Sequence, residues 1–136
     1  YTGDNMWREQ AAHRADHFVI LLLGMSDPGD LSKFAGDKKI NPANFTIANI
    51  DPDMRDNPTL ACTRTFALLP TKLPKFEAVL WETLKDLEAL QRDGMEVVCP
   101  DGKVRIGHPY LTGWLADLVE YSKIFAINSR SCPVCL

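Results

Sequence analysis

The sequence has no excess of positive charge and no long apolar run. Its 136 residues include 15 Lys and Arg against 18 Asp and Glu, a formal net charge of -3, which excludes an overall basic surface that binds nucleic acid by itself. No run approaches the roughly 18 to 20 apolar residues that cross a bilayer, so we expect no membrane partner. The first residues, YTGDNMWREQ, are polar and lack the apolar core of a signal peptide, which predicts an intracellular protein that is not secreted.

Cysteine is also scarce. The four cysteines are too few and too unevenly spaced for a disulfide framework, which predicts a reducing compartment. Cys132 and Cys135 form a CxxC motif, which supplies half of a tetrahedral zinc site, and His108, Cys99 and Cys62 are candidates for the other half. Free structural thiols are an alternative. A redox role is less favoured, because redox CxxC motifs lie at a helix N-terminus after a strand.

One apolar stretch ends at an acidic turn. The run from Phe18 to Leu23 stops at Gly24 and brings the chain to Asp27, in a Ser-Asp-Pro-Gly-Asp sequence. The run predicts a strand buried on both faces over Phe18 to Met25. A carboxylate just past such a strand is held by a rigid scaffold and still reaches solvent, as a metal ligand must. The alternative is that Asp27 only opens the turn.

Two further strands are predicted before the middle of the chain. FTIANI, residues 45–50, alternates apolar and small or polar side chains, and LACTRTFALL, residues 60–69, resumes that alternation. Residues 51–58 contain two prolines and predict a loop. Because the connections are too short for a crossover helix, the three strands are expected to form an antiparallel meander. Residues 1–16 are expected to form a short helix or a covering arm.

A long amphipathic helix is predicted from Pro74 to Asp93, where apolar side chains recur at three- and four-residue steps over about five turns. Gly94 lies where a C-terminal cap is expected. Glu88 and Arg92 have the spacing of a favourable i,i+4 pair.

The last third of the chain predicts a hairpin, a strand and a helix. MEVVCPDGKVRIGH has two short runs of strand-forming residues around Pro-Asp-Gly, which indicates a small hairpin. His108 and Pro109 indicate an extended start to the next element. The following pattern predicts a strand that ends near Asp117 and a helix from about Leu118. The expected fold class is therefore mixed α/β, in a single domain.

Asp27 and Asp117 each follow a predicted strand. If the later strand lies beside the first, the two carboxylates become neighbours at one edge of the sheet. Paired carboxylates suit Mg²⁺ or Mn²⁺, which prefer oxygen ligands and keep open positions for water and phosphate. Paired metals of this kind stabilise both the attacking and the leaving oxygen in phosphoryl displacement.

In order, and over essentially its whole length, the chain resembles the central region of fungal Plavaka-type transposases, a CACTA-like group of cut-and-paste DNA transposases. The most specific matching motifs are the Ser26-Asp27 turn with Phe34, Gly36-Asp37-Lys38, the FTIANI strand, the Gly-Trp-Leu-Ala-Asp run ending at Asp117, and the terminal CPVC.

The resemblance implies a partial RNase H-like fold with a DDE/D carboxylate triad. Asp27 stands at the family's first acidic position and Asp117 at its second. The resemblance also implies Mg²⁺ or Mn²⁺ as the cofactor, DNA as the partner, both at transposon ends and at the target, and a nuclear location. A homo-oligomer is a further expectation.

Residues 1–136 are expected to be one partial catalytic domain whose third carboxylate lies beyond Leu136. The chain departs from the family directly after both acidic residues, at Pro28 and Gly29 after Asp27 and at Leu118 to Tyr121 after Asp117. Tyr1 stands where a complete protein would have Met. We therefore expect a fragment, or a decayed or domesticated copy, of a transposase, and we expect the chain alone to be inactive. The alternative function is a non-catalytic binding module that keeps the fold, with a zinc clip through its CxxC.

Overall fold

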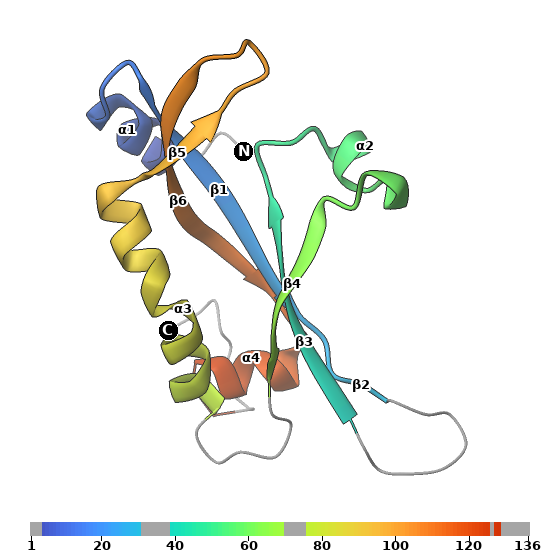
Figure 1. Ribbon diagram of the computed structural model, residues 1–136. Helices are drawn as coiled ribbons and strands as arrows, with labels where there is room; N and C mark the ends of the chain where they lie inside the picture. Colours follow the sequence, from blue (N-terminus) through green and yellow to red (C-terminus); the bar gives the residue numbers. More distant parts are fainter. Residues whose placement is uncertain (1–3, 31–38, 70–75, 126, 129–136) are drawn as a thin grey trace.

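The computed structural model describes residues 4–30, 39–69, 76–125 and 127–128, and within them a mixed sheet flanked by helices (Figure 1). The strands are β1 (His17–Ser26), β2 (Gly29–Asp30), β3 (Lys39–Ile47), β4 (Thr63–Leu69), β5 (Met95–Val98) and β6 (Val104–Leu115). The helices are α1 (Asp4–Ala12), α2 (Pro52–Arg55), the 3-10 turn η1 (Pro58–Leu60), α3 (Phe76–Asp93) and α4 (Leu118–Ile124).

The predicted antiparallel meander is confirmed. β3 pairs antiparallel with β1 and with β4, and β2 adds a short antiparallel pair to β3. β6 lies on the other side of β1 and runs parallel to it, and β5 pairs antiparallel with β6 at the edge. β1 is therefore the central strand, and each of its residues is buried or half-buried, as its apolar sequence predicted.

The predicted position of the second strand is wrong by several residues. β3 begins at Lys39 and ends at Ile47, whereas residues 45–50 were expected. β3 ends before Asn49 because the side chain of Asn49, and not its backbone, forms the hydrogen bonds to β1. Its Oδ1 accepts from the N–H of Leu21 at 2.7 Å, and its Nδ2 donates to the carbonyl of Val19 at 3.1 Å. The third strand likewise begins at Thr63, three residues later than expected.

The loop predicted over residues 51–58 contains helical turns. Asp51 caps α2 by accepting from the N–H of Asp53 at 3.0 Å, and Asn57 caps η1 by accepting from the N–H of Thr59 at 3.0 Å. In both turns a proline follows the capping residue. An Asp or Asn before a proline is therefore the start of a short helix here, which the loop prediction missed.

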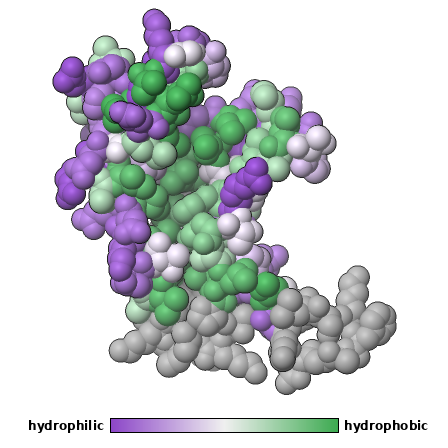
Figure 2. Space-filling view, in the orientation of Figure 1, coloured by the Kyte–Doolittle hydropathy of each residue, from purple (hydrophilic) through white to green (hydrophobic). Residues whose placement is uncertain are grey.

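The long amphipathic helix is confirmed as α3, and Pro74 lies outside the described residues. Gly94 ends the helix with a φ of 77°, a left-handed conformation that favours glycine. In Figure 2, hydrophilic side chains cover the outer side of α3, and hydrophobic ones lie over the central strands. The helix therefore buries its apolar side against the sheet.

The carboxylate of Asp93 raises the pKa of Arg92, and that of Glu88 raises it further, so the expected attraction between Glu88 and Arg92 is present but is not the closest contact of Arg92. Its guanidinium instead binds the neighbouring Asp93, with an Nε–Oδ1 distance of 2.9 Å. The side chains of Arg92 and Asp93 are largely exposed. Because the two residues are adjacent in sequence, their ion pair does not have to span a turn of the helix. The sequence spacing alone did not decide between these two acceptors.

The predicted hairpin is confirmed, but its second strand continues without a break. β6 is a 12-residue strand, so the hairpin strand and the strand before Asp117 are one element. Pro109 lies inside β6 and not at its start. This is tolerated because the pairing of β5 with β6 ends at Gly107, so the β5 ladder does not extend as far as the proline.

The core lies between the sheet and the helices α3 and α4, which contact each other (Figure 1). Phe45 and Phe66 stack with ring centroids 4.1 Å apart, and Trp114 meets both rings edge-on. The buried apolar members are Ala43, Leu69, Leu80, Leu84, Trp114 and Ile124. Among the residues that the structure describes, no helix is both long and apolar enough to span a membrane.

Candidate functional site

The parallel pairing of β1 with β6 brings the two predicted acidic residues to the same edge of the sheet. The last paired residues are Met25 and Leu115, and Asp27 and Asp117 each follow two positions later. Because the carboxyl ends of parallel strands meet at one edge, both carboxylates leave the sheet at corresponding positions. The expectation that the later strand lies beside the first is confirmed.

A one-residue bulge in β6 sets this correspondence. The register shifts at Thr112, which lies between the positions paired with Leu22 and Leu23. The Thr112 hydroxyl donates to the carbonyl of Leu22 at 2.9 Å. Without the extra residue, Asp27 would fall one position out of register with Asp117.

The carboxyl ends of the two strands are held together by Trp114. Its indole N–H donates to the hydroxyl oxygen of Ser26 at 2.9 Å. The ring lies so close to the backbone of Gly24 that an added Cβ would be 2.2 Å from Trp114 Cε3. Only glycine fits there. Ser26, the residue before Asp27, is thus bonded to Trp114, which lies three residues before Asp117.

The two acidic residues are in different local settings. Asp27 is exposed in the short turn between β1 and β2. Asp117 is exposed as well, but it caps α4, because its Oδ1 accepts from the N–H of Glu120 at 2.6 Å. A carboxylate has lone pairs on two oxygens, so capping leaves Asp117 with acceptor capacity for a further ligand.

Glu120 is a third carboxylate at this end of the fold, and the sequence analysis did not select it. It is 1% exposed, and its Oε1 accepts from Asn41 Nδ2 at 2.6 Å. Its Oε2 has no hydrogen-bond partner among the described residues, which is costly for a buried carboxylate oxygen. The Asp117-x-x-Glu120 spacing is that of a capping box, but nothing in the spacing indicates burial.

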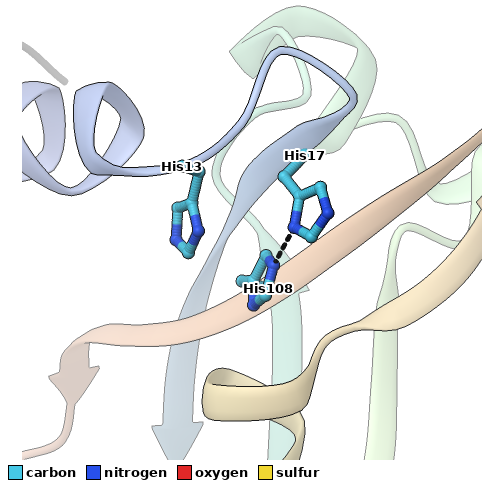
Figure 3. A group of neighbouring side chains, drawn as sticks. All are labelled: His13, His17 and His108. Atoms are coloured by element: carbon cyan, nitrogen blue, oxygen red, sulfur yellow. Dashed lines mark hydrogen bonds between the residues drawn. The ribbon is translucent and has the colours of Figure 1, made fainter.

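A cluster of histidines lies at the other end of the same two strands (Figure 3). His13 follows α1, His17 begins β1, and His108 comes from β6. Burial lowers the pKa of His13, and the neighbouring rings of His108 and His17 lower it further, while the carboxylate of Glu9 opposes them. From the sequence, only His108 was a candidate ligand, because nothing in the chain order brings the three histidines together.

Two of the candidate zinc ligands, Cys62 and Cys99, are not gathered with His108. Cys62 and Cys99 are half-buried free thiols, and neither belongs to the group of metal-ligating side chains around His108. Cys132 and Cys135 lie outside the described residues. A zinc site that includes the CxxC motif therefore stays a prediction.

Comparison with known proteins identifies the family. The Plavaka transposase family matches the chain over residues 1–136, its whole length. The chain belongs to the Plavaka transposase family. Searches among curated proteins and among solved structures found no match. The Plavaka family match confirms the resemblance drawn from the turn at Asp27 and the run that ends at Asp117.

Proposed function

We propose that this Plavaka chain supplies Asp27 and Asp117 as ligands of a divalent-metal centre for DNA strand cleavage and transfer. The observation that carries the proposal is the parallel register of β1 and β6, in which both residues follow the last paired positions by the same number of residues. The family match gives the DNA context. The function is therefore transposase-derived phosphodiester chemistry.

The order of the strands supports an RNase H-like fold. Three antiparallel strands are followed by α3, by the short strand β5, and then by β6, which returns beside β1 and runs parallel to it. This arrangement leaves the carboxyl ends of β1 and β6 side by side, where ligands of a mixed sheet commonly gather. It supports the proposed DDE/D assignment of Asp27 and Asp117.

The side chains present suit a hard cation. Exposed carboxylates at two adjacent strand ends make an oxygen-only donor set, which Mg²⁺ or Mn²⁺ prefers. When bound, such a cation supplies Lewis-acid stabilisation of phosphodiester oxygens. The roles of this chain are to hold it, through Asp27 and Asp117, and to fix the strand ends, through Ser26 and Trp114.

The proposed partners are transposon-end DNA and target DNA, and the proposed site of action is the nucleus. The support for both is membership of the Plavaka transposase family. With a formal net charge of -3, the chain has no general attraction for the phosphate backbone. DNA contacts are therefore expected to depend on the bound cation and on local groups, and a homo-oligomer would add further contacts.

The test is Mn²⁺ binding followed by electron paramagnetic resonance, which measures free Mn²⁺. We expect Asp27→Asn and Asp117→Asn each to weaken Mn²⁺ affinity by roughly tenfold or more, the size of effect seen on perturbing metal sites. Asn is as good a helix cap as Asp, so Asp117→Asn removes charge without unfolding α4. Asp53→Asn, at an exposed position in α2, is the matched control and should not change affinity.

Equal Mn²⁺ affinity in the parent and in both variants would contradict the proposal. With the fold intact, that result would favour the alternative function, a binding module that keeps the transposase fold without its metal chemistry.

A further inference from the structure

We propose that His13, His17 and His108 form a second metal site, which takes a borderline divalent cation such as Zn²⁺. These are all the histidines of the chain, and each offers a ring nitrogen within 4.8 Å of the others. They come from three separate segments, the turn after α1, the start of β1 and the first half of β6, near the amino end of its pairing with β1 (Figure 3). This inference does not depend on the proposed strand-transfer function.

The ring of His108 is oriented as in known metal sites. Its Nδ1 lies 2.8 Å from the carbonyl oxygen of Gln91, near the end of α3. Because a carbonyl oxygen only accepts, Nδ1 carries the proton, and the lone pair of Nε2 is left facing His17. Metal-binding histidines characteristically donate their second ring N–H in this way, which fixes the ring and its tautomer.

Gly94 leaves room for this ring. A Cβ added at Gly94 would be 2.9 Å from His108 Cε1 and 2.2 Å from Ile106 Cγ2. The glycine that ends α3 therefore also permits the close approach of His108 to the end of the helix. The ring is buried, 3% exposed, so its position does not depend on solvent.

His13 has a nitrogen without a partner. Its Nε2 is buried and makes no hydrogen bond to any part of the chain that the structure describes. A buried polar atom left in this state is destabilising, by about 1–3 kcal/mol in typical proteins. A ligand that accepts the lone pair of this nitrogen would remove the penalty, and a metal ion between the three rings is such a ligand.

Metal binding requires a small rearrangement. His17 Nδ1 and His108 Nε2 are 2.8 Å apart, at hydrogen-bond distance, whereas ligands of a tetrahedral zinc with bonds of 2.0–2.1 Å lie about 3.3 Å apart. Because His108 Nε2 accepts in this bond, His17 Nδ1 carries the proton, and on metal binding that proton must move to His17 Nε2, which lies 3.9 Å from Asp16 Oδ1. His13 stacks on His108 with ring centroids 4.1 Å apart and planes at 17°, and its ring must tilt to aim at a shared ion. His13 and His17 are only half-buried, so the adjustment falls on them.

The donor set decides the class of cation. Three neutral imidazoles favour Zn²⁺, Co²⁺, Ni²⁺ or Cu²⁺, whereas Mg²⁺ prefers oxygen. Two carboxylates lie close enough to balance the positive charge. Asp16 Oδ1 is 3.9 Å from His17 Nε2, and Glu9 accepts from the Tyr110 hydroxyl at 3.0 Å on the α1 side of the cluster. The fourth coordination position is open to water.

The site is structural and distant from the acidic edge. His17 and Asp27 are ten residues apart along β1, which is roughly 30 Å at about 3.3 Å per residue. The ion would join α1 to β1 and β6, and, through the Gln91 carbonyl, to the end of α3. Its expected effect is to hold α1 on the sheet.

The experiment is Co²⁺ titration of the full chain, followed by visible absorption, with Zn²⁺ as the competitor. We expect the d–d bands of a four-coordinate ion, their loss on addition of Zn²⁺, and affinity at least roughly tenfold weaker in His13→Gln and in His17→Gln. Cys99→Ser is the matched control and should bind as the parent does. Intense thiolate charge-transfer absorption that persists in both histidine variants would overturn the assignment and place the ion on cysteines.

A second measurement covers the case in which a variant folds poorly. Zinc that binds only the native state raises the thermal unfolding temperature, and we expect this rise in the parent and in Cys99→Ser but not in His13→Gln. No rise in the parent, together with no d–d bands, would show that the three rings only stack and hydrogen-bond.

Discussion

The two ends of the β1–β6 pair present opposite donor chemistry. At the carboxyl end, Asp27 and Asp117 are exposed oxygen donors placed by backbone register. At the amino end, His13, His17 and His108 are nitrogen donors brought together by side-chain packing between three segments. One pair of strands thus carries the proposed hard-cation site at one end and the proposed borderline-cation site at the other, and each depends on a different level of structure.

The largest expected effect is on the packing that fixes the carboxyl end. Trp114→Ala removes the indole from the core and from its bond to Ser26, so we expect a loss of about 3–5 kcal/mol in the free energy of unfolding. Guanidinium denaturation measures it. Trp81 is 65% exposed, and Trp81→Ala is the control, with an expected change within about 0.5 kcal/mol. Equal losses would show that Trp114 does not hold the strand ends.

A smaller effect is expected at the buried carboxylate. Asn41→Ala removes the donor to Glu120 Oε1 and leaves a buried carboxylate without a partner, at a cost of about 1–3 kcal/mol. Thr65→Val removes the exposed hydrogen bond to Asn44, which has the same length of 2.6 Å, and should cost less. Urea denaturation of both variants makes the comparison. A larger loss in Thr65→Val would contradict the importance of burial.

Substitutions at Asp117 separate its role as the cap of α4 from its proposed role as a metal ligand. Asp117→Ala removes both the cap on α4 and the carboxylate, and the lost cap should cost about 1 kcal/mol. Asp117→Asn keeps the cap and removes only the charge, so it should unfold like the parent yet bind Mn²⁺ more weakly. Denaturation and Mn²⁺ titration on the same samples measure both properties. If Asp117→Asn kept the Mn²⁺ affinity of the parent as well as its stability, Asp117 would be a cap and not a ligand.

The smallest expected effect concerns the hairpin that leads into β6. The Arg105 guanidinium lowers the pKa of Asp101, and the N–H of Lys103 lowers it further. A folded-state pKa below the ordinary value of about 3.9 stabilises the fold above that pH, and the contribution is lost as pH falls through the folded-state pKa.

Asp101→Asn should therefore show a slightly shallower decline of unfolding temperature in acid, measured by circular dichroism. Asp53→Asn is the control, with an unchanged acid decline. A steeper decline in Asp101→Asn would reverse the sign and refute the account of the Arg105 contact.

The parts of the fold that sequence predicted are those set by local periodicity and turn chemistry. The apolar run after His17, the stripe on α3, and the Pro-Asp-Gly hairpin each appear where expected. The end of β3 did not, because the Asn49 side chain replaces a backbone partner. Such a bond joins residues about 30 positions apart, and no local pattern indicates it.

The acidic edge was predictable and the histidine cluster was not. Asp27 and Asp117 follow strands that the pattern indicates, and the family motifs fall on the same residues. Their exact correspondence depends on the bulge at Thr112, for which Gly113 within a strand pattern was the available sign. His13 and His17 met His108 only through folding, since neither spacing nor composition links positions 91 residues or more apart.

The most direct test compares both ends of the strand pair in one spectrum. In ¹H–¹⁵N NMR with substoichiometric Mn²⁺, a bound ion broadens the amide signals nearest to it. We expect the signals of Met25, Asp27 and Asp117 to broaden first in the parent, while those of His17 and His108 stay sharp, and we expect this effect to be lost in Asp27→Asn. Broadening first around His17 and His108, or unchanged broadening in Asp27→Asn, would contradict a carboxylate metal site at the end of β1 and β6.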